Sequence, residues 1–216
     1  MEAINLHLGD CLEAMRAMPD KTYDLAIVDP PYGIGAGGLS FKSGTRKKSN
    51  FHKVNDWDTS TPHQEYWEEL FRVSKNQIVW GANYMTNYLP PSKGWVVWDK
   101  KTGDNSYGDG ELAYTSFDRA LKIVVKYWSG AHAKEKNQID RIHPTQKPVQ
   151  LYEWLLDNYA KEGERILDTH LGSGSIAIAC HNRGFSLDAW EIDAEYYEAA
   201  SKRFNEHKAQ LTIWNP

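Results

Sequence analysis

The stretch RILDTHLGSGS, residues 165–175, decides the fold of this 216-residue chain. It reads as a buried strand over 165–168 that ends in a carboxylate, passes through a glycine turn and enters a helix expected over 176–182. The next strand, expected over 186–191, ends in Glu191, which can accept hydrogen bonds from both hydroxyls of a ribose. Because the turn lacks the full GxGxxG sequence that cradles a pyrophosphate, a nucleoside cofactor without phosphates fits better than NAD. A simple strand-to-helix turn is the alternative.

Short β-rich runs and amphipathic stretches alternate along the rest of the chain. We expect strands over 3–8, 24–29, 77–80, 95–98 and 121–125, and helices over 10–18, 64–73, 149–160 and 195–207. This alternation is typical of an α/β layer fold with a largely parallel sheet. The length favours a single domain over 1–216, because one core of this size can stabilise the chain.

Two stretches of the chain are expected to be loops. The first, at about 33–56, carries five glycines and five basic residues, and 33–55 holds no acidic residue. The basic residues are Lys42, Arg46, Lys47, Lys48 and Lys53. Loops this long in a compact domain are typically lids or binding loops, and these side chains would suit contact with the phosphates of a nucleic acid. The second loop, at about 129–142, is mixed in charge and a weaker candidate; for both, a solvated segment is the alternative.

The composition limits the possible classes of protein. With 25 basic and 29 acidic residues the net charge is −4, which argues against a protein that coats nucleic acid over its whole surface but permits a local basic patch. The two cysteines, Cys11 and Cys180, and the eight histidines show no metal-ligand spacing, so we expect no metal. No apolar run approaches membrane-spanning length and no secretory signal is visible, so we expect a cytoplasmic protein that binds no membrane.

The most specific local sequence is Asp29-Pro30-Pro31-Tyr32, directly after the buried strand over 24–29. The amino group of a planar base is a poor nucleophile because its lone pair is delocalised into the ring. The Asp29 carboxylate and the Pro30 carbonyl could each accept one N–H bond, so that the lone pair points at an electrophile. The two prolines restrict the backbone, and Tyr32 offers a flat face on which a base can stack. The sequence therefore predicts alkyl transfer to an amino nitrogen.

Five motifs in one order make the chain resemble an S-adenosylmethionine-dependent DNA amino-methyltransferase of the β order, in which the catalytic motif precedes the cofactor motif. They are Gly9-Asp10-Cys11, Asp29 to Tyr32, His143 to Pro148, Asp168 to Ser175 and Glu191-Ile192-Asp193. The resemblance covers nearly the whole chain. It implies a Rossmann-like, doubly wound sheet of seven strands in the order 3-2-1-4-5-7-6, with one antiparallel strand and helices on both faces.

The resemblance also implies roles for individual residues. Asp168, Gly172, Ser173 and Gly174 would line the methionine part of S-adenosylmethionine, together with His170 and beside the catalytic Asp29. Glu191 would hold the ribose, Asp10 would approach the adenine, and Thr145 and Lys147 would help to hold the amino-acid end. His170 departs from the family, which usually has an aromatic residue there; its ring can still stack, so we expect altered affinity rather than an inactive site.

These observations predict methyl transfer to the N6 amino group of adenine in DNA, after the target nucleotide has rotated out of the duplex. An aspartate at the first position of the catalytic motif favours adenine, but cytosine-N4 methylation remains an alternative. A catalytically inactive DNA- or nucleoside-binding relative is a second alternative. Methylation of a protein amide or an RNA base fits the motif order less well. No separate target-recognition module of about 100 residues is visible, so recognition would fall to the two loops, and a homodimer is possible.

Overall fold

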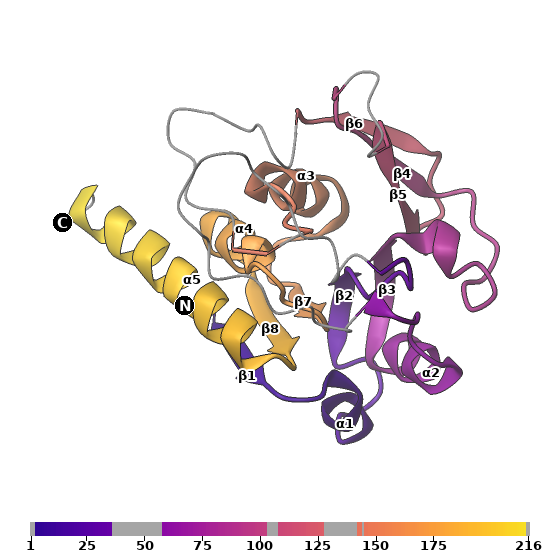
Figure 1. Ribbon diagram of the computed structural model, residues 1–216, viewed down its shortest axis with the longest axis horizontal. Helices are drawn as coiled ribbons and strands as arrows, with labels where there is room; N and C mark the ends of the chain where they lie inside the picture. The colour runs from indigo at the N-terminus through magenta and orange to yellow at the C-terminus, as the bar shows by residue number, and fades with distance from the viewer. Residues whose placement is uncertain (1–2, 36–57, 103–107, 128–141, 144, 215–216) are drawn as a thin grey trace.

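The computed structural model describes residues 3–35, 58–102, 108–127, 142, 143 and 145–214. These residues form one mixed sheet in the order β1-β8-β7-β2-β3-β5-β4-β6 (Figure 1). The strands are β1 (Ile4–Leu8), β2 (Tyr23–Val28), β3 (Ser74–Trp80), β4 (Trp95–Asp99), β5 (Gly110–Thr115), β6 (Lys122–Val125), β7 (Arg165–Asp168) and β8 (Ser186–Glu191). Neighbouring strands are parallel except where β5 pairs with β3 and β4.

Helices cover both faces of this sheet (Figure 1). They are α1 (Cys11–Arg16), α2 (Gln64–Val73), α3 (Val149–Tyr159), α4 (Ser175–Arg183) and α5 (Ala194–Trp214), with a short 3₁₀ helix, η3 (Ala82–Tyr84), after β3. Apolar side chains of α1 and α2 form one core with β2 and β3. Those of α3, α4 and α5 form the second core on the opposite face. The arrangement is the doubly wound α/β fold that the sequence predicts.

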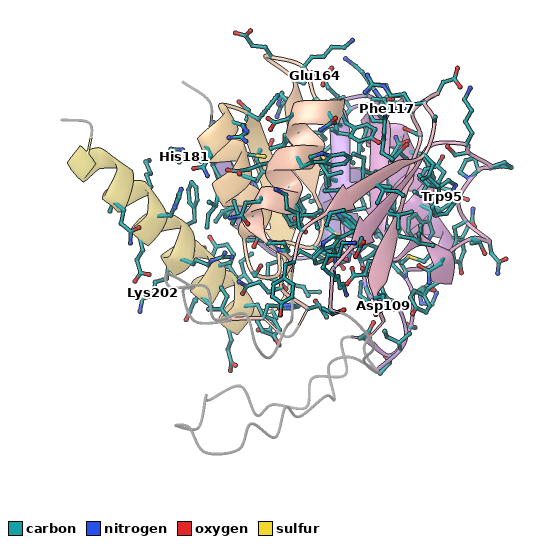
Figure 2. The ribbon with its side chains drawn as sticks, turned by 90° about the horizontal axis from the view of Figure 1, so that it is seen from above. Trp95, Asp109, Phe117, Glu164, His181 and Lys202 are labelled. Atoms are coloured by element: carbon teal, nitrogen blue, oxygen red, sulfur yellow. The ribbon has the colours of Figure 1, made fainter. Side chains whose placement is uncertain are left out.

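Local sequence explains these elements. In α2 the buried residues Tyr66, Trp67, Leu70 and Val73 recur at helical spacing, so one side of the helix packs on the sheet. The strand β2 is buried along nearly its whole length, as expected for a central parallel strand covered on both faces. The two ends of the sheet lie at opposite sides of the molecule. Figure 2 shows Lys202 of α5 at one side and Trp95 of β4 at the other.

The predicted strand order is confirmed, but the predicted count of seven strands is wrong. The order β1-β8-β7-β2-β3-β5-β4 reproduces 3-2-1-4-5-7-6, and β5 is the antiparallel strand. An eighth strand, β6, pairs in parallel with β4 at the outer edge. The sequence also failed to predict β5, because its GELAYT sequence begins with glycine and alternates weakly. Pairing on both sides stabilises it as a strand.

In the described part of the chain, no helix has both the length and the apolar character needed to cross a bilayer. The helix α5 is longer than the expected 195–207: it begins at Ala194 and continues to Trp214. The five basic residues expected to contact DNA lie in 36–57, outside the described residues, as does 128–141 with most of the second loop.

Candidate active site

Parallel strands bring the predicted acidic residues to one edge of the sheet. Asp29 follows β2, Asp168 ends β7 and Glu191 ends β8, and these three strands are neighbours in the sheet. Because β5 runs antiparallel, its first residues lie at this same edge, which brings Glu111 there as well. The carboxyl edge of a doubly wound sheet is where such folds bind ligands.

A cavity of about 260 Å³ lies at this edge. Its lining includes eight of the predicted site residues: Asp29, Pro31, Thr145, Lys147, His170, Gly172, Ser173 and Glu191. His143, the first residue of the motif at 143–148, also lines it, as do Tyr152 and Tyr196, which sequence reasoning had not assigned. The catalytic motif and the glycine turn, some 140 residues apart in the chain, therefore share one cavity.

Five predicted residues are not part of this lining: Asp10, Pro30, Tyr32, Asp168 and Gly174. Asp10 caps α1, where its carboxylate accepts the Leu12 N–H at 2.7 Å. Asp168 lies behind the turn and accepts the backbone N–H of His170 at 3.0 Å. Burial raises the pKa of Asp168 to about 8, so its carboxyl group is largely protonated at neutral pH.

The glycine turn needs its glycines for backbone conformation and for packing. Gly172 and Gly174 have φ angles of 51° and 69°, in the left-handed region that disfavours other residues. A β-carbon at Gly174 would come within 3.2 Å of the Ala200 β-carbon, so the absent side chain lets α5 pack closely on the turn. The Gly172 N–H donates to Glu191 Oε2 at 2.9 Å, which ties the turn to the end of β8.

Glu191 is held by two backbone donors, because its Oε1 also accepts the Asp193 N–H at 3.0 Å. Each of its carboxylate oxygens retains a second lone pair that can accept a hydroxyl from the cavity. Burial raises the pKa of Glu191, although the two N–H donors oppose that shift. The side chain is thus oriented as a double acceptor at the cavity wall.

His170 is a neutral ring in a hydrogen-bonded chain. Its Nδ1 lies 2.8 Å from Thr169 Oγ1, which lies 2.7 Å from the Tyr66 hydroxyl. Burial lowers the pKa of His170 to about 4, so the imidazole is uncharged at neutral pH. The imidazole therefore adds an uncharged, polar edge to the cavity where the family usually has an aromatic ring.

The catalytic motif is held by an internal hydrogen bond and by contacts with Asp58 and Tyr84. The Tyr32 hydroxyl donates to Asp29 Oδ1 at 2.6 Å. The buried Asp58 carboxylate accepts the backbone N–H groups of Tyr32, at 2.6 Å, and Gly33, at 2.9 Å. The Tyr32 ring stacks on Tyr84 with centroids 5.4 Å apart, so one of its two faces is already occupied.

Lys147 forms an ion pair with Asp29, and both residues line the cavity. Its Nζ lies 2.5 Å from Asp29 Oδ2 and 3.2 Å from Glu111 Oε2, and its side chain is 3% exposed. Burial alone would lower the pKa of this ammonium, but the two carboxylates outweigh burial and raise it. Lys147 is therefore a cation fixed between two anions. The sequence had suggested a contact with the cofactor for Lys147, not a pairing with Asp29.

Sequence reasoning missed Asp58, Glu111, Gly81 and Tyr84. Asp58 is 26 residues after Tyr32 and carries no motif. Glu111 belongs to the strand that was not predicted, and Gly81 and Tyr84 follow β3, where a glycine after a buried strand was the available signal.

Comparisons with known proteins agree with this geometry. The family model described as DNA methylase, of the N6/N4 methyltransferases, matches residues 74–202, more than half of the chain. The type II methyltransferase M.HpaI of Haemophilus parainfluenzae is 26% identical over 91% of this chain and 73% of its own length. The type II methyltransferase M2.LlaDCHI of Lactococcus lactis subsp. cremoris is 25% identical over 94% of this chain and 89% of its own length.

Solved structures share the fold. The crystal structure of the M1.HpyAVI–SAM complex aligns with a TM-score of 0.59 and 18% identity, covering 94% of this chain and 99% of that one. The PvuII cytosine-N4-specific DNA methyltransferase aligns with a TM-score of 0.61 and 11% identity, covering 95% of this chain and 92% of that one. The chain belongs to the DNA methylase family of N6/N4 amino-methyltransferases, and S-adenosylmethionine is its methyl donor.

Proposed function

We propose that the chain methylates the N6 amino group of adenine in DNA, at a nucleotide rotated out of the duplex. One observation carries the proposal: Asp29 of the catalytic motif lines the same cavity as Gly172 and Glu191 of the cofactor motifs. A methyl donor held at the glycine turn would therefore lie beside an amino group held at Asp29. That proximity is what converts a weak nucleophile into a reactive one.

The cavity residues suit S-adenosylmethionine. Glu191 presents a doubly anchored carboxylate for the ribose hydroxyls, and Gly172 and Ser173 of the turn line the cavity where the methionine part would lie. Thr145 also lines the cavity, where it would contact the amino-acid end. When bound, S-adenosylmethionine supplies an electrophilic methyl group on a sulfonium.

Asp29 and Pro30 orient the substrate. The carboxylate and the Pro30 carbonyl would each accept one N–H of the amino group, which leaves its lone pair directed at the methyl group. No strong base is needed, because the alkylated nitrogen is acidic enough to lose its proton to Asp29 or to water. The Tyr32 ring, backed by Tyr84, would stack on the base, a contact worth about 1–3 kcal/mol.

Asp at position 29 favours adenine over cytosine by the family pattern. The type II relatives further support a place in restriction–modification. In this proposal residues 1–216 form one methyltransferase domain, and the loops at about 33–56 and 129–142 provide minimal DNA recognition, with a homodimer possible.

The test is incubation of the protein with labelled S-adenosylmethionine and unmodified DNA, followed by nucleoside mass spectrometry. We expect N6-methyladenine and no N4-methylcytosine; the reverse result would overturn the adenine assignment. Asp29→Ala should abolish transfer while the affinity for S-adenosylmethionine changes less than threefold. Cofactor binding without transfer to any DNA by the wild-type protein would favour the inactive binding relative.

A further inference from the structure

Asp29 has no oxygen free of a partner in this structure. Its Oδ1 accepts the Tyr32 hydroxyl, and its Oδ2 accepts the Lys147 ammonium. Under the proposed function, an amino group must approach this carboxylate. The Tyr32 contact comes from a side chain of the same motif, whereas Lys147 reaches Asp29 from a distant part of the chain. Lys147 is therefore the group that an incoming amino group would displace.

Lys147 cannot leave Asp29 without another anion. Its ammonium is almost fully buried, and a buried cation without a partner costs several kcal/mol. The backbone of Lys147 is anchored, because its carbonyl oxygen accepts the Ser175 hydroxyl at 2.7 Å. Only the end of the side chain is then placed to move, and it can reach only nearby acceptors.

Glu111 provides that acceptor. Its Oε1 pairs with Lys100 at 2.6 Å. Its Oε2 is buried, lies 3.2 Å from Lys147 Nζ, and makes no hydrogen bond to any described residue. The contact is an ion pair longer than that with Asp29, and a small movement of the ammonium toward Oε2 would shorten it. An unsatisfied buried acceptor normally calls for an explanation, and here it faces the one cation that must shift.

Aromatic rings border the ammonium between its two carboxylates. Lys147 Nζ lies 5.5 Å from the centroid of the Trp80 ring and 5.6 Å from that of Tyr32. Ring faces at this distance attract a cation, so both rings contribute to the stabilisation of the buried ammonium. The charges also balance, because Lys100 and Lys147 face Asp29 and Glu111.

We propose that Glu111 is a positioning residue that receives the Lys147 ammonium when the substrate amino group occupies Asp29 Oδ2. This inference rests on the proposed function. Lys147 protects the Asp29 carboxylate in the free protein, and Glu111 makes its withdrawal possible. A purely structural Glu111 would instead serve only to balance Lys100 and Lys147.

The decisive variants are Glu111→Gln, Lys147→Met and the two combined, assayed at saturating S-adenosylmethionine. In Glu111→Gln the ammonium has Asp29 as its sole carboxylate, so kcat/KM for DNA should fall at least tenfold. The affinity for S-adenosylmethionine should change less than threefold. In the double variant no ammonium competes for Asp29, and kcat should exceed that of Glu111→Gln at least threefold. Lys75→Met is the control, because it breaks a lysine–carboxylate pair, with Asp24, that lies outside the cavity lining; its activity should stay within threefold of wild type.

Two results would overturn the proposal: wild-type turnover by Glu111→Gln, or a double variant no faster than Glu111→Gln. A second measurement needs no substitution. In a structure of the wild-type protein with target DNA and an unreactive S-adenosylmethionine analogue, Lys147 Nζ should lie closer to Glu111 than to Asp29. An ammonium still on Asp29 Oδ2 beside a bound base would reject the proposal. Full turnover by Asp29→Ala would instead reject the proposed function itself.

Discussion

The Tyr32 ring packs against the α-carbon of Gly81, so that a β-carbon at position 81 would come within 2.1 Å of Tyr32 Cε1. Gly81 also has a φ of 65°. Gly81→Ala should therefore displace the Tyr32 ring, whose hydroxyl donates to Asp29, and kcat should fall at least tenfold. Steady-state kinetics with DNA as the varied substrate checks this.

The control for Gly81→Ala is Gly163→Ala. Gly163 has a φ of 82°, but a β-carbon there would meet nothing within 4 Å. The Gly163→Ala variant therefore has the cost of a left-handed backbone conformation at a non-glycine residue, about 1–2 kcal/mol, without the steric clash. Equal kinetic losses in both variants would mean that destabilisation, and not the position of Tyr32, explains the result.

Asp58 fixes the backbone of the catalytic motif through a single carboxylate oxygen that accepts two N–H groups. Asp58→Ala leaves both donors without this acceptor, and we expect a loss of about 1–3 kcal/mol in the free energy of unfolding. Asp58→Asn keeps a carbonyl oxygen at this place and should retain most of the stability and turnover. Denaturant unfolding and kcat measure the two effects; equal losses in Asn and Ala variants would contradict the acceptor role.

The fold could be predicted from sequence because its signals are local. Buried runs such as 24–29, the prolines after Asp29 and the glycines at 172–174 act on the backbone within a few residues. Strand order followed from the family resemblance. The edge strand β6 is an addition to the family's strand order. It pairs with the edge of β4 that does not pair with β5, and no sequence motif marks that pairing.

The sequence predicted the motif residues of the cavity but not the contacts between them. Motif residues such as Asp29 and Glu191 lie where strand ends place them. The contacts of Asp29 could not be predicted, because Lys147 is 118 residues away in sequence and Glu111 reaches the edge through an antiparallel strand. Long-range ion pairs of this kind leave no periodic trace in the sequence.

Asp168 makes the stability of the fold depend on pH. Its pKa is about 8 in the folded protein against an ordinary value of 3.8, because the side chain is buried. Between these values the folded state holds a proton that the unfolded state releases. The stabilisation is complete below pH 3.8 and is lost as pH rises toward 8, at up to about 1.4 kcal/mol per pH unit.

Asp168→Asn should remove this contribution. Unfolding free energies at pH 5.5 and 7.5 should fall with pH more steeply in the wild type than in the variant. Taking the difference between the two proteins cancels the contributions of all other titrating groups. Identical slopes would mean that Asp168 is ionised in the folded protein over this range.

Lys47 and Lys48 lie outside the described residues, and their expected contact with DNA phosphates can be tested by salt dependence. If both contact phosphates, Lys47→Ala/Lys48→Ala should weaken binding and reduce the slope of log K against log salt by about 2. Lys161→Ala/Lys202→Ala is the control, because it changes the net charge equally at exposed positions on the α3–β7 turn and on α5. Fluorescence anisotropy with a short duplex at several salt concentrations gives both slopes. If the two double variants share one slope, net charge accounts for the effect and the loop at about 33–56 is not part of the DNA interface.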